Sequence, residues 1–235
     1  MTKISQSITA KRCVYCGSAE NVTDDHIPPK NIFPKPRPTN INLITVPACK
    51  KCNSSFSNDD EYFRLKLCIS EHVGNHPDAL ANQNVIFRSL RKPEAKGLRK
   101  SFMGDLQRVQ LRTRGGIYLG QTYIFDVDLK RIFSVIERIV RGLYYVETST
   151  ILSQEYEVDV HSDDTLKDES PELIEELRQK ILTPLSEIPP KIIGNKTFMY
   201  RFHITEEEPI FSVWALTFYG QANFLSLTGP RREIG

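Results

Sequence analysis

The sequence predicts an α+β fold, in which a small N-terminal unit precedes a larger companion region. Two Cys-x-x-Cys pairs, at residues 13–16 and 49–52, enclose short strand-like segments and lead into a helix-like segment. A strongly amphipathic segment over residues 128–146 predicts the central helix of the companion. Segments of alternating hydrophobicity near the carboxyl end predict β-strands. We therefore expect an N-terminal unit over residues 1–75 and an α+β companion over residues 76–235.

The four paired cysteines predict a metal site, and they are Cys13, Cys16, Cys49 and Cys52. Two intervening residues allow both sulfurs of a tight turn to bind one ion, and four thiolates close a tetrahedral zinc shell without an open position. We therefore predict a structural Zn²⁺ that stabilises the N-terminal unit. Two disulfides or unrelated buried cysteines are the alternatives, which the doublet spacing disfavours. The fifth cysteine, Cys68, falls on an apolar helical stripe and is predicted to lie in the core.

Between the two cysteine pairs the chain carries an acid, a histidine and an amide. Residues 21–26 predict a strand that ends in Asp25 and His26, and residues 41–46, which include Asn42, predict a second strand. Adjacent residues of a strand point to opposite faces, so one side chain can hold a metal ion while the other faces a water molecule. A lone histidine is more often a satisfied core residue. Its position beside an aspartate, within a four-cysteine frame, favours a functional site.

The loop between the two predicted strands is rich in proline and carries Lys30, Lys35 and Arg37, which are suited to contacting phosphates. Proline stiffens a loop that cannot form regular structure. A helix is predicted directly after the second cysteine pair, over residues 53–72, and Asn53 begins it.

The order Cys-x-x-Cys, Asp-His, Asn, Cys-x-x-Cys-Asn resembles the HNH endonuclease family, in its zinc-containing ββα-metal branch. The resemblance covers residues 12–62. It implies that Asp25 is a metal ligand, that His26 is the general base and that Asn42 braces the loop carrying His26. It also implies that Asn53, where most family members have histidine, is the third catalytic motif residue, so Asp25 and Asn53 would hold the catalytic cation.

A further family ligand one helical turn later would fall at Ser57, which is a poor ligand. Asp60 and Glu61 lie on nearly the same helix face as Asn53 and are candidates to complete the shell. Oxygen ligands favour Mg²⁺ or Mn²⁺ over a second zinc ion.

The chemistry that the resemblance implies is metal-dependent hydrolysis of phosphodiester bonds in DNA. A neutral histidine accepts a proton from water at physiological pH, and a divalent cation stabilises the charge on the phosphate and on the leaving oxygen. RNA is not excluded, because it presents the same phosphate. Family members with companion regions serve in restriction, phage defence or mobile elements.

The sequence of the companion region predicts both helices and strands. A helix over residues 82–92 follows a break at residues 74–77, and two strands flank a Gly115-Gly116 turn. The helix over residues 128–146 has an apolar stripe. Its opposite face, with Arg138 and Arg141, is predicted to meet water, with contact to DNA as the alternative. The remaining expected segments are a strand (156–160), a loop (162–170), a helix (171–181) and three strands (196–204, 210–219 and 223–227).

Composition and charge indicate a soluble protein with an anionic partner. Of the 235 residues, 40% are hydrophobic and 26% are charged. No apolar run is long enough to span a bilayer and no secretory signal is expected, so we expect a cytoplasmic protein without a membrane partner. Residues 82–141 carry thirteen basic and five acidic residues, whereas residues 142–235 carry eight basic and sixteen acidic ones. Basic segments favour binding of DNA, although solvated faces would give the same pattern.

Three functions remain open from the sequence alone. The first is a metal-dependent HNH endonuclease. The second is a catalytically silent zinc module that binds nucleic acid, and the third is an interaction protein in which zinc is only a structural staple. The role of the companion stays open between recognising DNA, a protein partner or a small signal and forming a homodimer.

Overall fold

The computed structural model describes residues 11–37, 41–71, 73–104 and 106–231. Helices and strands are grouped along the chain rather than strictly alternating, and the strand pairs of the described residues are all antiparallel. The predicted α+β class is therefore confirmed. No helix within the described ranges is both long enough and apolar enough to cross a membrane.

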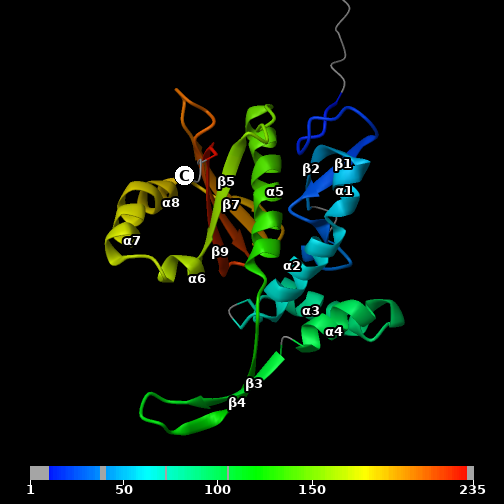
Figure 1. The fold of residues 1–235 in the computed structure, drawn as a ribbon, viewed down its shortest axis with the longest axis vertical. Coiled ribbons are helices and arrows are strands. Elements are labelled where there is room, and N and C mark those ends of the chain that lie inside the picture. Colours follow the sequence, from blue (N-terminus) through cyan, green and yellow to red (C-terminus); the bar gives the residue numbers. More distant parts are fainter. Residues whose placement is uncertain (1–10, 38–40, 72, 105, 232–235) are drawn as a thin grey trace, which may run out of the picture.

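The N-terminal part is a two-stranded hairpin followed by two consecutive helices (Figure 1). The elements are β1 (Val22–Ile27), β2 (Ile44–Cys49), α1 (Lys50–Ser55) and α2 (Ser57–Ile69), with a 3₁₀ turn at Lys30–Ile32. Strand β2 lies three residues later than predicted and contains Pro47. Proline is tolerated there because β1 is the one partner of β2 among the described strands.

The helix predicted over residues 53–72 begins earlier and is interrupted. Cys49 caps α1, since its sulfur accepts a hydrogen bond from the backbone N–H of Cys52. The chain turns at Phe56 before α2 begins. The predicted end at His72 lies outside the described residues.

Two further helices and a hairpin follow. They are α3 (Pro77–Leu90), α4 (Lys96–Gly104), β3 (Leu106–Arg112) and β4 (Tyr118–Phe125), with a 3₁₀ turn at Pro93–Ala95. Helix α3 begins five residues before its predicted start, because His76 caps it and Pro77 occupies the first turn. The β3–β4 hairpin pairs as predicted around the Gly115-Gly116 turn.

The long helix α5 (Leu129–Thr148) lies along a five-stranded antiparallel sheet (Figure 1). The sheet has the order β5–β9–β8–β7–β6. Its strands are β5 (Tyr156–Ser162), β6 (Lys191–Ile193), β7 (Phe198–Ile204), β8 (Ser212–Phe218) and β9 (Ala222–Pro230). Asp128 caps α5 by accepting hydrogen bonds from the backbone N–H groups of Lys130 and Arg131.

Three short helices connect β5 to β6, namely α6 (Asp163–Lys167), α7 (Pro171–Leu177) and α8 (Thr183–Glu187). A π-helical turn over Arg178–Leu182 joins α7 to α8. The loop predicted over residues 162–170 was wrong in its first half. Ser162 and Thr165 form a capping box that starts α6 in a polar segment without an apolar stripe.

One buried cluster includes residues from both predicted parts of the chain. Phe63 of α2 packs against Phe218 and Phe224 of the sheet, with ring centroids 5.1 and 6.4 Å away. Helix α5 approaches β1 closely, because a β-carbon placed on Gly142 would lie 2.7 Å from Cγ1 of Ile27. The strand that carries Asp25 and His26 is thus packed directly against the central helix of the companion.

Candidate functional site

The four paired cysteines meet at one point. Their sulfur atoms all lie within 4.8 Å of one another, and all four are free thiols. The first pair is held against the hairpin by a hydrogen bond from the Val14 N–H to the carbonyl of Pro47, 2.9 Å long. Gly17 closes the first turn with φ of +72°, a backbone conformation that glycine adopts readily.

This arrangement can hold a metal ion, as predicted. A hydrogen bond from the Cys52 N–H lowers the pKa of the Cys49 thiol to about 7, whereas burial raises the pKa of the Cys52 thiol. Cys49 is therefore the thiol that most readily forms the thiolate that binds metal. Four sulfur ligands leave no position for a substrate, so the cluster is consistent with a structural zinc site. Cys68 lies apart from it, buried against the hydroxyl of Tyr219 at 3.4 Å, and its prediction as a core residue is confirmed.

Asp25 is buried on the inner face of β1, with both carboxylate oxygens engaged. The Tyr15 hydroxyl donates to Oδ2 at 2.8 Å, and the backbone N–H of His26 donates to Oδ1 at 2.9 Å. Nη1 of Arg138, from helix α5, lies 3.5 Å from Oδ2. Burial, together with the nearby Asp25 carboxylate, raises the pKa of Tyr15, which keeps this hydroxyl a hydrogen-bond donor.

Arg138 joins Asp25 to Asp60 of helix α2. Its second terminal nitrogen, Nη2, donates to Oδ1 of Asp60, and its guanidinium stacks over the ring of Phe56 at 4.3 Å. Only 4% of the Arg138 side chain is exposed. Burial raises the pKa of Asp60 to about 6, against the opposing effect of Arg138. The single buried guanidinium of Arg138 therefore pairs with two carboxylates, one from β1 and one from α2.

The prediction that the arginine face of α5 meets water was wrong for two of its arginines. Arg138 and Arg141 are both buried. Arg141 pairs with Glu137 at 2.9 Å and donates to the carbonyls of Leu152, Ser153 and Tyr156. Helical periodicity placed these arginines on a polar stripe, but their partners come from distant segments that periodicity does not register.

His26 lies on the other face of β1 and is half-buried. Burial and the nearby charges of Lys30 and Arg37 lower its pKa below 6.5, against opposing effects of Asp25 and Asp24. The imidazole is therefore mostly neutral at pH 7. Arg37 donates to the backbone carbonyl of Lys30 at 2.8 Å. This hydrogen bond holds the Arg37 side chain next to Lys30 in the proline-rich loop.

The two asparagines occupy different positions around the hairpin. Nδ2 of Asn53 donates to Oγ1 of Thr23 at 3.2 Å and to the carbonyl of Asp24 at 3.3 Å, which ties α1 to β1. Asn42 is exposed, just before β2, and makes no hydrogen bond to the described residues. The predicted bracing contact of Asn42 is thus not among the described contacts.

The three residues that were candidates to complete the cation shell differ in the partners that their side chains already have. Ser57 donates its hydroxyl to the carbonyl of Ser54 at 3.2 Å. Glu61 pairs with Arg64 at 2.6 Å and is 42% exposed. Asp60 alone shares a partner with Asp25.

Asp25 and Asn53 each have an oxygen atom that could accept a further contact. Oδ1 of Asp25 accepts one hydrogen bond from the described residues, and a carboxylate oxygen can accept more than one. The amide oxygen of Asn53 accepts no hydrogen bond from the described residues, because its contacts use Nδ2. Two hard oxygen donors of this kind suit Mg²⁺ or Mn²⁺.

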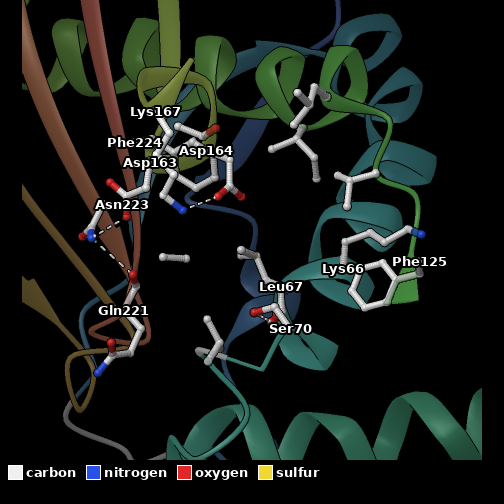
Figure 2. A pocket seen from close by; sticks show the side chains of 16 residues that line it. Lys66, Leu67, Ser70, Phe125, Asp163, Asp164, Lys167, Gln221, Asn223 and Phe224 are labelled. Carbon is white, nitrogen blue, oxygen red and sulfur yellow. Dashed lines mark hydrogen bonds and ion pairs between the residues drawn. The ribbon is translucent and has the colours of Figure 1, made fainter. Parts of the chain in front are cut away.

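A separate cavity of about 630 Å³ lies between α2, the start of α5, α6 and the end of the sheet (Figure 2). Apolar residues such as Leu67, Leu129 and Phe224 line it, and Lys66, Lys167 and Asn223 are among its polar residues. Lys167 pairs with Asp164 at 2.7 Å. None of the predicted site residues lines this cavity.

No protein-family model matches the chain, and neither the curated proteins nor the solved structures include a significant match.

Proposed function

We propose that this protein is an endonuclease of the HNH type, which hydrolyses phosphodiester bonds in DNA with the help of a divalent cation. The observation that carries the proposal is His26, a half-buried imidazole with a lowered pKa beside Lys30 and Arg37. His26 lies on the hairpin whose two ends carry the four clustered cysteines. A neutral base next to two cations suits a reaction in which water attacks a phosphate diester.

In the proposed reaction, His26 accepts a proton from the attacking water through a ring nitrogen. Lys30 and Arg37 attract the phosphate and bring it to the imidazole. On the opposite face of the strand, Tyr15 and Arg138 fix the carboxylate of Asp25. Asp25 and Asn53 would hold Mg²⁺ or Mn²⁺, and the bound cation would stabilise charge on the phosphate and on the departing oxygen. The cysteine cluster would hold a structural Zn²⁺ and take no part in the reaction.

The test is cleavage of supercoiled plasmid by the purified protein in EDTA, in Mg²⁺ and in Mn²⁺. We expect nicking or linearisation that requires added metal. His26→Ala should lower the rate by roughly 10²–10⁴-fold, the usual contribution of a general base. His203→Ala, a change at an exposed histidine of β7, is the matched control and should cut at the parental rate. Full activity of His26→Ala would refute the assignment.

A second candidate is a zinc module that binds nucleic acid without cutting it. Ser57 favours this candidate, because a weak ligand stands where the family has a stronger one and its hydroxyl is already bonded to Ser54. The candidate predicts salt-dependent DNA binding with no cleavage in Mg²⁺, Mn²⁺, Co²⁺ or Ni²⁺.

A further inference from the structure

The β3–β4 hairpin extends away from the body of the protein (Figure 1). Its two strands pair only with each other among the described strands. Large side chains along it are open to solvent, with 67% of Ile117 and 64% of Leu119 near the tip and 62% of Tyr123 nearer the base exposed. An isolated two-stranded ribbon is only marginally stable in water, so an exposed ribbon of this kind points to a partner that covers it.

The base of the hairpin is fixed to helix α2. The buried Lys66 donates to the carbonyl of Asp126 at 2.6 Å, and its ammonium lies 4.7 Å from the ring centroid of Phe125. The backbone N–H of Asp128 donates to the hydroxyl of Tyr62 at 2.7 Å. The ribbon is therefore held at its base and presents its tip in a defined direction.

The charge of the ribbon is entirely positive. Residues 106–125 contain three arginines, Arg108, Arg112 and Arg114, and no acidic residue. All three are exposed, and no carboxylate of the described residues forms an ion pair with them. In contrast, four helical arginines each have a carboxylate partner, namely Arg64, Arg131, Arg138 and Arg141. The uncompensated positive charge of this region thus extends along the ribbon.

Helices α3 and α4, which precede the ribbon, extend this charge. They and the turn between them contribute a group of basic residues that form no ion pair with the described residues, namely Arg88, Arg91, Lys92, Lys96, Arg99 and Lys100. Figure 1 places α3, α4 and the ribbon at the same end of the molecule. A polyanion that contacts the ribbon would meet further positive charge at its base.

We propose that the β3–β4 hairpin is a DNA-binding ribbon that enters the major groove of duplex DNA. The inference rests on the proposed nuclease function and names the element that holds its substrate. The major groove admits a two-stranded ribbon, and the three arginines are placed to contact the phosphates beside it. Ile117 and Leu119 at the tip would make apolar contacts with base edges in the same groove, such as the methyl group of thymine.

The test measures binding separately from cutting. Affinity for a fluorescent 30-base-pair duplex is measured by anisotropy, in EDTA and over a range of salt concentrations, with the full chain carrying His26→Ala. Adding Arg108→Gln, Arg112→Gln and Arg114→Gln should reduce the slope of log K against log salt by about 2.7, at about 0.9 per phosphate contact. The matched control changes Lys167, Arg178 and Lys180 to Gln, which removes the same charge from exposed sites elsewhere and should leave the slope unchanged.

A second variant, Ile117→Ser with Leu119→Ser, tests the tip. We expect weaker duplex binding at an unchanged salt slope, because no charge is removed, together with an unchanged molecular mass in solution. All substitutions are at exposed side chains, so the melting temperature should stay at the parental value.

Four results would overturn the proposal. The first is a salt slope in the arginine variant equal to that of the control, and the second is a preference for single-stranded RNA over the duplex. The third is a dimer that the tip variant converts to a monomer while duplex binding persists, because the ribbon would then bind a second copy. If plasmid cleavage persists in any of these three cases, the nuclease proposal stands and only the proposal about the ribbon is discarded. The fourth is a parent protein that neither binds nor cuts DNA, which would remove both proposals.

Discussion

Replacing Arg138 by methionine should destabilise the protein strongly, because it leaves two buried carboxylates without their shared cation. Burial already raises the pKa of Asp60 from 3.8 to about 6 with Arg138 in place. At about 1.36 kcal/mol per pKa unit, the ionised Asp60 costs the fold about 3 kcal/mol. Removing one partner of a buried ion pair typically costs about 3–5 kcal/mol, and we expect a loss in this range at pH 8.

The assay is urea unfolding followed by the fluorescence of Trp214, the single tryptophan, which is fully buried in β8. Arg178→Met is the control, because Arg178 is 64% exposed and pairs loosely with Glu175 at 3.8 Å. It should change the free energy of unfolding by less than about 1 kcal/mol. Adding Asp60→Asn to Arg138→Met should recover part of the loss, since it removes one of the unpaired charges.

The loss should also depend on pH in a defined direction. A raised carboxyl pKa means that the folded state binds more protons than the unfolded state, so stability falls as pH rises from the unfolded value to the folded one. Without Arg138 the pKa of Asp60 rises further, and the fall extends above pH 6. The loss of unfolding free energy in Arg138→Met should therefore be smaller at pH 5 than at pH 8. A deficit equal to that of Arg178→Met, or a double variant less stable than Arg138→Met, would refute this reasoning.

Three other outcomes are expected. Cys49→Ser should lose the bound zinc, measured by elemental analysis, and unfold at a lower temperature than the parent. Gly142→Ala should cost about 1–3 kcal/mol of unfolding free energy, because its methyl group would meet Ile27; Gly97→Ala, with open space around it, should cost nothing. The cleavage rate should rise with pH to a plateau with its midpoint below 6.5, because the pKa of His26 is lowered and only the neutral imidazole accepts a proton; a midpoint above 7 would contradict this.

The cysteine cluster was predictable from the sequence because its spacing is local. Two intervening residues determine how a tight turn presents its sulfurs, and the two turns then needed only a hairpin to bring them together. The central helix was predictable for the same reason, since its apolar stripe repeats every three or four residues.

The surroundings of Asp25 were not predictable in this way. Arg138 lies far from Asp25 and Asp60 in the sequence, and an arginine on a polar stripe ordinarily meets water. Tyr15, which donates to Asp25 from within the first cysteine turn, gave no signal except its proximity to Cys16. The Arg138 contacts depend on how α5 docks on the hairpin, and the Tyr15 contact depends on how the first cysteine turn packs against β1.

The docking of α5 on β1 has a consequence for the order in which the protein matures. A chain is synthesised from its N-terminus, and its segments fold as they emerge. The four cysteines are complete once residue 52 has emerged, whereas Arg138 and Gly142 follow much later. A nascent chain can therefore take up zinc while Asp25 still lacks its guanidinium partner. Under the proposed function, the carboxylate of Asp25 would be fully fixed only when α5 is also in place, so we expect shorter chains to bind zinc without an ordered catalytic site.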